Sequence, residues 1–460
     1  MDKIELLKSR RSALLDCGRD IREKISAITD ENSFVELDAY SFSHNDFYGE
    51  DAQGEGVVTG YATIDGTSVC VIAQNVKVLS GGISNANCRK IRKCLDKAYE
   101  TESPVVYLFD SLGVRVGEGV NVLEGVAEVL SASADLKGVV PQFSVVVGKL
   151  YGSFAVLAAG ADYNFMLEES RVAYASPLVL SAKAGKNLSD ADVAGVKASV
   201  KNSMATFVVK DLAEVKSTIC DVLSVLPEYS GDVTDTDDDF NRVSEKLNES
   251  ACAKCVIEAV FDGGKMIELN KDYCPEVCTD IGRIGGMSVA ALVFRGGEDG
   301  VELTCENVDK ISDFVAYANR NGLPLVTFVN TLGIKTDLAT SNTTILKKIY
   351  LLTEILNGAK RLSVVYGKAI GLGYTLFAAK SLGVSYSYAF ADAKIGLFDG
   401  AASAVAFGEV REDKLAELEE RYSDDNADPI NAAKNGYIDN VIEPQFVRAY
   451  VISALQTVVR

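Results

Sequence analysis

Two stretches of the sequence join an apolar run, closely spaced glycines and a run of small residues. The first is residues 144–160, SVVVGKLYGSFAVLAAG, and the second is residues 363–380, SVVYGKAIGLGYTLFAAK. A strand that passes through a glycine turn into a helix aims backbone N–H groups beyond the helix N-terminus. The pattern therefore predicts two sites that stabilise negative charge on an oxygen atom, as an oxyanion hole does.

The glycines of the first stretch, Gly148 and Gly152, also have a structural interpretation. They could serve only to let a strand and a helix pack closely. That interpretation is the commoner one for a single copy, because glycine patterns are weak signals. The repetition of the pattern within one chain favours the functional interpretation.

Polar side chains follow two apolar runs, at Asp110–Arg115 and at Asn330–Lys335. Ligands gather at the carboxyl ends of strands in open α/β sheets. Arg115 and Lys335 are therefore candidates for carrying the charge of a ligand. The alternative, a turn with a solvated base, is equally compatible with the sequence.

A basic segment stands out in the acidic chain. It consists of Arg89, Lys90, Arg92 and Lys93, within a predicted helix over residues 85–101. Such a segment could meet the phosphates of a nucleotide-bearing ligand. A solvated helix face is the commoner explanation for a run of charges.

Two cysteine pairs have spacings close to those of zinc ligands, Cys252 with Cys255 and Cys274 with Cys278. Residues from Cys255 onward read as a helix, however, and the second pair is more widely spaced. We expect four free thiols and no metal site. The run from Asp232 to Asp239 lacks the alternating spacing and glycine of a calcium loop, so a solvated linker is the favoured interpretation.

Composition restricts the partners. The net charge of −19 and the pI of about 4.7 disfavour nucleic acid and anionic membranes as partners. No apolar run reaches the roughly 18 residues that span a membrane, and scattered cysteines without a secretory signal favour a reduced, cytoplasmic compartment. The one histidine, His44, excludes a histidine pair or a histidine relay within the chain.

The order of predicted elements indicates an α/β fold. Helices are expected over residues 1–29, 85–101, 120–131, 412–421 and from 443 to the end. A β-hairpin is expected over residues 56–74, where Asp65-Gly66 forms a strong turn signal. Buried strands are expected over residues 104–109 and 139–147.

The second half of the chain repeats the first. Ser103–Gly113 corresponds to Leu323–Gly333 at an offset of 220 residues, and Gly148 and Gly152 correspond to Gly367 and Gly371 at an offset of 219. A charged segment, residues 226–250, separates the halves. We predict two homologous domains, residues 1–231 and 232–460.

Several segments together resemble a known family, the carboxyltransferase subunits of biotin-dependent acyl-CoA carboxylases and acyl-CoA decarboxylases. The resemblance is carried by residues 33–38 (SFVELD), 56–66 (GVVTGYATIDG), 110–115, 118–120, 138–142 (GVVPQ) and 432–444 (AAKNGYIDNVIEP). It implies two tandem crotonase-like domains, built as ββα spirals. The N-terminal half would hold the acyl-CoA thioester, and the C-terminal half would hold biotin.

In that family, biotin is attached to a biotin carboxyl carrier protein. The other partners are a biotin carboxylase, which carboxylates the biotin, or the further subunits of a decarboxylase. The chain has no Met-Lys-Met attachment site, so biotin is expected from a partner. The resemblance further implies an oligomer, usually a hexamer, with active sites formed between the halves of neighbouring subunits.

The implied chemistry is transfer of a carboxyl group between carboxybiotin and an acyl-CoA through two enolates, each held in an oxyanion hole. Matching the family's motifs to this sequence places the oxyanion hole for the thioester at Gly152 and Ser153. It places the oxyanion hole for biotin at Gly371, Leu372 and Gly373. The residues expected to contact the acyl-CoA are Gly113, Arg115, Gly148, Tyr151, Arg89, Lys90, Arg92 and Lys93.

The chain departs from the family pattern at the glycine stretches. Tyr151, Ser153 and Leu372 stand where small residues are usual. This supports an alternative, a catalytically weakened paralogue that serves as an assembly subunit beside an active homologue. A third interpretation is a biotin-independent crotonase-type acyl-CoA enzyme.

Overall fold

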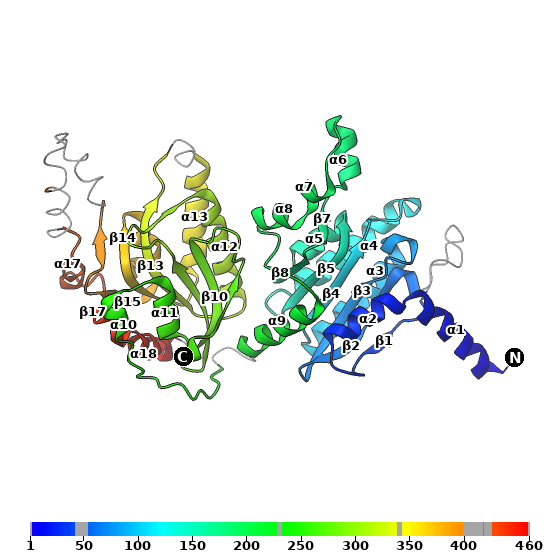
Figure 1. The fold of residues 1–460 in the computed structure, drawn as a ribbon, viewed down its shortest axis with the longest axis horizontal. Coiled ribbons are helices and arrows are strands. Elements are labelled where there is room, and N and C mark those ends of the chain that lie inside the picture. The colour runs from blue at the N-terminus through cyan, green and yellow to red at the C-terminus, as the bar shows by residue number, and fades with distance from the viewer. Residues whose placement is uncertain are drawn as a thin grey trace. The chain divides into compact units, whose positions relative to one another are not determined.

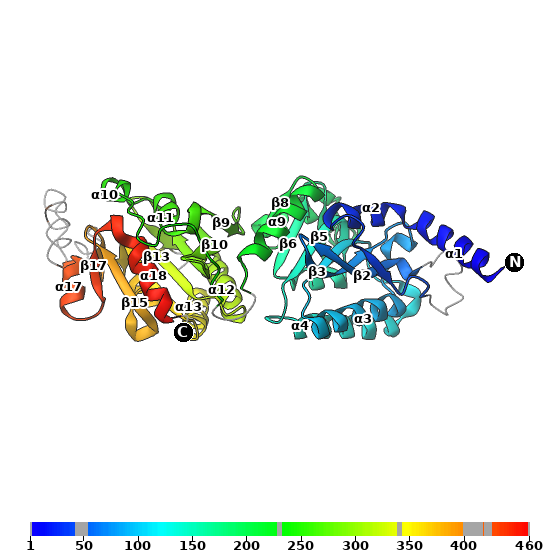
Figure 2. The same ribbon diagram turned by 90° about the horizontal axis from the view of Figure 1, so that it is seen from below.

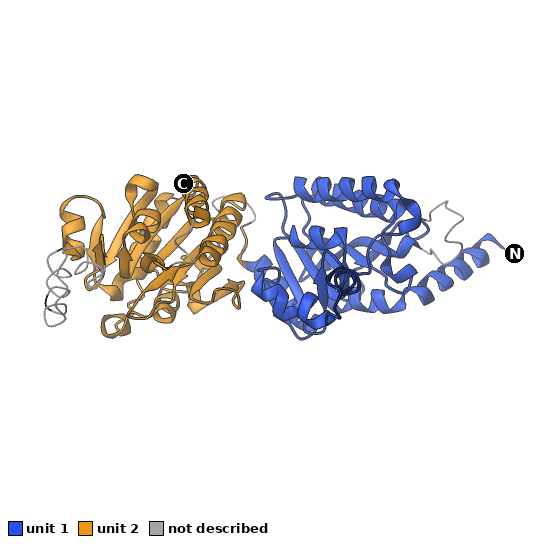
Figure 3. Ribbon diagram, turned by 90° about the horizontal axis from the view of Figure 1, so that it is seen from above, with its two compact units in different colours: residues 1–224 blue, residues 225–460 orange. Residues whose placement is uncertain are grey.

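The chain forms two compact units, residues 1–224 and 225–460 (Figures 1 and 3). The structure, a computed structural model, describes residues 2–41, 54–227, 232–337, 343–398, 417 and 426–458. His44 and most of the predicted helix over residues 412–421 lie outside these ranges. Among the helices within them, none combines the length and the apolar character that crossing a membrane requires.

The first unit is built around one mixed sheet. Its strands are β1 (Val35–Leu37), β2 (Val57–Ile64), β3 (Thr67–Gln74), β4 (Val105–Ser111), β5 (Gln142–Tyr151), β6 (Tyr163–Leu167), β7 (Arg171–Ala173) and β8 (Phe207–Val209). They lie in the order β1-β2-β3-β4-β5-β6-β8, and β7 pairs with the far end of β5. The first three strands are antiparallel and the rest are parallel.

Helices cover both faces of this sheet (Figure 2). The helices of the unit are α1 (Lys3–Cys17), α2 (Arg19–Ile28), α3 (Asn85–Thr101), α4 (Val120–Asp135), α5 (Ser153–Ala159), α6 (Pro177–Ala184), α7 (Asp190–Ala194), α8 (Val196–Lys201) and α9 (Leu212–Val225), with short 3-10 turns η2 (Leu79–Gly81) and η3 (Val116–Glu118). Helices α3 and α4 pack together over one face and α2 lies on the other (Figure 2). The core between the sheet and α3–α4 contains Ile72, Tyr107, Phe109, Ile91 and Val126.

The second unit repeats the arrangement. Its strands are β9 (Met266–Leu269), β10 (Val277–Ile284), β11 (Met287–Phe294), β12 (Val301–Leu303), β13 (Leu325–Ile334), β14 (Arg361–Ile370), β15 (Val384–Phe390), β16 (Lys394–Gly396) and β17 (Asn440–Ile442). They lie in the order β17-β15-β14-β13-β11-β10-β9, with β16 on β14 and β12 on β13. Strand β16 thus occupies on β14 the place that β7 occupies on β5.

The helices of the second unit follow the same plan. They are α10 (Lys246–Glu249), α11 (Ala253–Val260), α12 (Cys305–Arg320), α13 (Thr343–Asn357), α14 (Leu372–Phe377), α17 (Pro429–Lys434) and α18 (Val447–Val458), with 3-10 turns η4 (Asp262–Gly264), η5 (Lys380–Leu382) and η6 (Pro444–Phe446). Helices α12 and α13 pack together as α3 and α4 do. The duplication predicted from sequence is therefore present in the topology.

The duplication extends to individual hydrogen bonds. Asp30 accepts from the N–H groups of Asp65 (3.1 Å) and Gly66 (3.0 Å). Asp262 accepts in the same way from Gly285 and Gly286, each at 2.8 Å. In the β2–β3 turn, Asp65 has φ +47° and Gly66 has φ +76°, so the predicted hairpin turn is confirmed and belongs to the primed class.

Three predictions about local structure are wrong in detail. The N-terminal helix is two helices, α1 and α2, separated at Gly18. The strand predicted to end at Val147 continues to Tyr151, because its partner changes from β6 to β7. The acidic segment is not simply solvated, because Asp238 pairs with Arg242 (3.1 Å) and accepts from the Gly263 N–H group (2.8 Å).

Candidate active site

The first turn, residues 151–153, joins β5 to α5. Gly152 has φ +85°, a conformation that favours glycine. Its N–H group donates to the carbonyl oxygens of Ala173 (3.2 Å) and Tyr174 (3.0 Å), so this donor is already used. The first N–H groups of a helix have no intrahelical partner, and no described residue accepts from the Ser153 N–H group. Ser153 therefore supplies a donor at this turn.

The end of β4 approaches the first turn. Gly113 has φ +116°, and its Cα atom lies 3.6 Å from the position that a β-carbon on Gly152 would take. The Gly113 N–H group donates to Ser111 Oγ at 3.2 Å. The two strand ends predicted to share a site, at Gly113 and at Gly152, are thus brought together.

The second turn, residues 370–373, joins β14 to α14 in the same way. Gly371 has φ +54°, and its N–H group donates to Gly396 O at 2.9 Å. A β-carbon placed on Gly333 would lie 3.5 Å from Gly373 N and 3.6 Å from Leu372 N. Within the described ranges, neither of these two N–H groups has an acceptor. The second turn therefore presents two donors beside Gly333.

A pocket of about 310 Å³ adjoins the first turn. It is lined by Ala155, Val156, Ala159, Val172, Ala173, Tyr174, Val193, Ala198, Ser199, Asn202 and Met204. The alanines of α5 leave the space, and the carbonyl groups of Ala173 and Tyr174 that fix Gly152 form part of the same wall. The pocket thus lies between α5, β7 and the helices α7 and α8, and an apolar group would find room in it.

A larger pocket of about 660 Å³ adjoins the second turn. Its lining residues come from α14, β16, α17 and the segments that adjoin them: Gly371, Leu372, Tyr374, Thr375, Ile395, Gly396, Leu397, Phe398, Asn426, Asn431, Ala432, Asn435 and Tyr437. The Leu372 side chain is 43 % exposed and lines this pocket. Aliphatic and aromatic walls with a few amides suit a small, largely apolar ring.

Gly148 lies inside β5 and not in the turn, contrary to the sequence-based prediction. A β-carbon on Gly148 would lie 2.3 Å from Asp110 Oδ1, and one on Gly367 would lie 2.4 Å from Asn330 Oδ1. Each of these polar side chains also accepts the next backbone N–H group, Lys149 at 3.2 Å and Lys368 at 2.9 Å. Burial raises the pKa of Asp110. The two glycines let a polar side chain lie against the strand that leads to each turn.

Arg115 points into the protein. Its guanidinium group pairs with Glu55 at 2.7 Å, and both side chains are almost completely buried. It also donates to the Glu55 carbonyl oxygen at 3.2 Å. Arg115 thus holds the segment before β2 against η3, and its charge does not reach solvent in this arrangement.

The basic segment divides into one buried and three more accessible side chains. Lys90 is 3 % exposed and donates to Gly54 O (2.9 Å) and Val57 O (2.6 Å). Burial lowers its pKa to about 8. Arg92 pairs with Asp96 and Lys93 with Asp38 at the surface, and Arg89 is exposed. Lys310 occupies in the second unit the place of Lys90 and donates to Asn270 O, Tyr273 O and Cys274 O.

Tyr151 is 5 % exposed. Its side chain shares a strand face with Lys149, two residues before it, and Lys149 pairs with Asp190 at 2.9 Å. Burial is the main cause of its raised pKa, and the Asp190 carboxylate adds to it. Tyr151 is therefore buried near Asp190, at the start of α7, and is absent from the lining of the pocket at the first turn.

The cysteine prediction is correct for one pair and wrong for the other. Cys274 and Cys278 are free thiols, whereas Cys252 and Cys255 form a disulfide. Cys252 immediately precedes α11, and the first turn of this helix brings Cys255 close to it. Among the described residues, no group of three or more histidine, cysteine, aspartate or glutamate side chains is placed to hold a metal ion.

Sequence reasoning did not single out Ser111 and Thr331. Their hydroxyl groups accept from the N–H groups of Gly113 and Gly333, at 3.2 and 3.0 Å. The signal was present, because the two hydroxyl residues stand 220 positions apart, at the same offset as the surrounding segments. They fix the strand ends that face each turn.

Comparison with known proteins identifies the family. A family model described as the carboxyl transferase domain matches residues 16–460. The propionyl-CoA carboxylase beta chain of Saccharopolyspora erythraea is 28% identical over 95% of this chain and 87% of its own length. The methylmalonyl-CoA decarboxylase subunit alpha of Veillonella parvula is 29% identical over 94% of this chain and 89% of its own length.

A solved structure of transcarboxylase 12S, a hexamer with methylmalonyl-coenzyme A and methylmalonic acid bound, has the same fold. Its TM-score is 0.90 at 24% identity, over 98% of this chain and 94% of that chain. The fold is therefore α/β with two tandem crotonase-like domains, as the resemblance implied. With two sheets of like topology, two equivalent glycine turns and a family match over nearly its whole length, the chain belongs to the carboxyl transferase family of biotin-dependent acyl-CoA carboxyltransferases.

Proposed function

We propose that the chain is the carboxyltransferase subunit that moves a carboxyl group between biotin on a partner carrier protein and an acyl-CoA. The observation that carries the proposal is the pair of equivalent turns. Each presents helix N-terminal N–H groups, at Ser153 and at Leu372 and Gly373, beside a glycine at the end of the neighbouring strand. Carboxyl transfer needs two oxygen atoms to bear negative charge, and such donors stabilise that charge.

The first turn is assigned to the acyl-CoA, within the domain of residues 1–231. The Ser153 N–H group would donate to the thioester oxygen as the α-proton leaves and an acyl enolate forms. The apolar pocket beside Val172 and Met204 would take part of the acyl group or of the CoA arm. The role of Gly152 would be conformational, because its own N–H group is bonded to Ala173 and Tyr174.

The second turn is assigned to biotin, within the domain of residues 232–460. The residues present fit such a ring, since the pocket is about 660 Å³ and has aliphatic and aromatic walls. Biotin, when bound, supplies the carrier of the carboxyl group. The N–H groups of Leu372 and Gly373 would hold its ureido oxygen, while Leu397 and Tyr437 would exclude water from it.

The partners follow from this assignment. A biotin carboxyl carrier protein would bring the biotin, and biotin carboxylase or decarboxylase subunits would complete the system. The relatives are named as a carboxylase chain and a decarboxylase subunit, and transcarboxylase 12S is described as a hexamer. We place the protein in the cytoplasm, as an oligomer.

An assembly subunit of low activity is the second candidate. The observation that favours it is the Leu372 side chain, which stands in the pocket at the second turn. In that case the chain alone would not catalyse biotin-dependent decarboxylation of malonyl-CoA or methylmalonyl-CoA. Activity would appear only beside a homologue.

A proline scan of the two turns tests the proposal. Proline is well accepted at the first position of a helix and removes its N–H group. Ser153→Pro and Leu372→Pro should each lower biotin-dependent decarboxylation by about 10²–10³-fold, with little change in unfolding temperature. The matched controls Ser153→Ala and Leu372→Ala keep the N–H groups and should retain most activity. Equal activity of the proline and alanine variants would overturn the assignment.

A further inference from the structure

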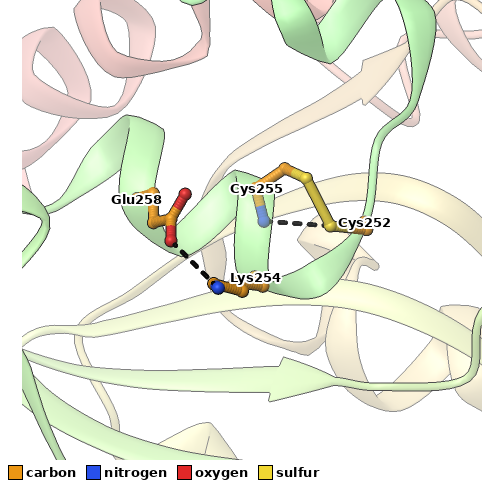
Figure 4. Close-up of a disulfide and its surroundings, with 4 residues drawn as sticks. All are labelled: Cys252, Lys254, Cys255 and Glu258. Atoms are coloured by element: carbon orange, nitrogen blue, oxygen red, sulfur yellow. Dashed lines mark hydrogen bonds and ion pairs between the residues drawn. A yellow bond between two sulfur atoms is a disulfide. The ribbon is translucent and has the colours of Figure 1, made fainter.

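The disulfide between Cys252 and Cys255 has no part in the two turns. Cys252 is exposed and precedes α11, and Cys255 lies in the first turn of that helix (Figure 4). The Cys255 N–H group donates to Cys252 Sγ at 3.1 Å. Two residues, Ala253 and Lys254, separate the cysteines, which is the spacing of dithiol–disulfide exchange sites.

We propose that Cys252 and Cys255 form a redox-active disulfide, which exchanges reversibly with an external dithiol. A thiolate of that dithiol attacks the exposed Cys252 sulfur, and the Cys252–Cys255 bond breaks with Cys255 leaving as a thiolate. The second thiol of the reductant then displaces Cys252. The reductant becomes a disulfide, and its two electrons and two protons end on Cys252 and Cys255. The reverse exchange, with an oxidised disulfide such as glutathione disulfide, restores the bond.

The surroundings favour a thiolate at Cys252. Helix N-termini carry partial positive charge, and the Cys255 N–H group already donates to the Cys252 sulfur. The charge of the neighbouring Lys254 is directed to Glu258, which it pairs with at 3.7 Å, so the helix N-terminus is what favours the thiolate. Cysteines in such places are the reactive ones. The exposure of Cys252 leaves a path for an incoming thiol.

The helix would survive opening of the disulfide. Its apolar side, with Val256, Ile257 and Val260, is buried. Its far end is held by Arg242, whose Nη2 donates to Glu258 O, Ala259 O and Phe261 O at 2.9–3.1 Å. The completely buried Arg448 donates to Val260 O as well. Because the structure around α11 does not depend on the bond, the exchange is reversible and not a step of unfolding.

The test is a redox titration of the full-length native protein. The protein is equilibrated in mixtures of reduced and oxidised dithiothreitol, or of glutathione and glutathione disulfide. Thiols are then trapped with iodoacetamide and located by mass spectrometry. We expect Cys252 and Cys255 to gain and lose label together, as one two-electron couple, with an unchanged circular dichroism spectrum. Cys274, which is partly exposed, and Cys278, which is buried, have a wider spacing; they serve as the internal control and should not form a disulfide.

Labelling rates of the reduced protein provide a second measurement. Cys252 should react with iodoacetamide at least about tenfold faster than Cys274, since the helix N-terminus favours its thiolate. In the Cys255→Ser variant, glutathione disulfide should form a mixed disulfide at Cys252, whereas Cys252→Ser should form little at Cys255. A disulfide that opens only on denaturation, or thiols that stay reduced in glutathione disulfide, would overturn the proposal. Neither result depends on carboxyltransferase activity, so the two proposals fail separately.

Discussion

Individual polar residues in this protein are often buried, and their pairing determines what each does. Asp280 on β10 is completely buried, and none of the described residues forms a hydrogen bond with either of its carboxylate oxygens. Burial raises its pKa to about 8, the Glu268 carboxylate adds to the shift, and Arg295 and Lys310 oppose it. The carboxyl group is therefore held protonated near neutral pH.

The first prediction concerns stability against pH at this residue. In the unfolded chain an aspartate has a pKa of about 3.9, so between pH 4 and 8 unfolding releases a proton. The free energy of unfolding should fall as pH rises through this window, by at most about 1.4 kcal/mol per pH unit. Asp280→Asn removes the titration and should flatten the curve in urea titrations from pH 5 to 7.5. The exposed control Asp221→Asn should leave the slope unchanged, and an unaltered slope in Asp280→Asn would contradict the assignment.

The second prediction concerns Gly148. An alanine there would place its β-carbon 2.3 Å from the Asp110 carboxylate, so β5 or Asp110 must move. Overpacking of this kind costs typically about 1–3 kcal/mol, and Gly148→Ala should show such a loss in urea-induced unfolding. Gly358→Ala is the matched control, because its nearest neighbour is Ile355 O at 3.8 Å. If both variants are equally stable, the contact with Asp110 does not explain Gly148.

At the scale of elements, a buried lysine in each unit, Lys90 or Lys310, donates hydrogen bonds to the backbone of the corresponding loop. Lys90 on α3 and Lys310 on α12 are both 3 % exposed and donate to carbonyl groups of the segments that lead into β2 and β10. The sequence showed Lys90 only as one of four neighbouring bases. Lys90 differs from the other three because it lies on the buried face of α3, which packs against the sheet.

The third prediction distinguishes the structural role of Lys90 from the role of the exposed bases Arg89 and Lys93. Lys90→Met leaves two carbonyl groups without a donor and should lower the free energy of unfolding by about 2–4 kcal/mol. The double substitution Arg89→Gln and Lys93→Gln alters exposed charges and should change stability by less than about 0.5 kcal/mol. If this segment meets CoA phosphates, the double variant should instead raise KM for the acyl-CoA several-fold. An unchanged KM would leave the segment as a solvated helix face.

At the scale of the whole molecule, each unit carries apolar side chains that it does not bury itself. On α13, Leu346, Tyr350 and Leu351 are 56–66 % exposed. At the start of α4, Val120 and Leu123 are 75 % and 56 % exposed. Contiguous exposed apolar groups of this kind are typical of subunit contacts.

The fourth prediction is that the protein forms a hexamer through such faces. Six chains of 49.2 kDa give about 295 kDa, which light scattering after size exclusion would measure. Tyr350→Glu should shift the mass toward smaller species, since it buries a charge at the contact. Tyr99→Glu, on an exposed part of α3, is the matched control and should not. A monomer of the unmodified protein would contradict the prediction.

The sequence by itself determined the larger plan. Strand and helix alternation, the Asp65-Gly66 hairpin and the 220-residue repeat can all be recognised locally, because turn chemistry and apolar periodicity act between near neighbours. The two glycine turns were found for the same reason. The family resemblance then supplied the chemistry that the turns serve.

Only the tertiary structure decided which groups are available for chemistry. The Gly152 N–H group is used by Ala173 and Tyr174, and the Arg115 charge by Glu55, 60 positions away. Lys90 turns inward because the carbonyl group of Gly54 lies within reach, and Cys252 is oxidised because Cys255 lies beside it. Burial and pairing depend on residues distant in the chain, which no local pattern records, so the sequence located the turns but could not tell which of their donors were already used.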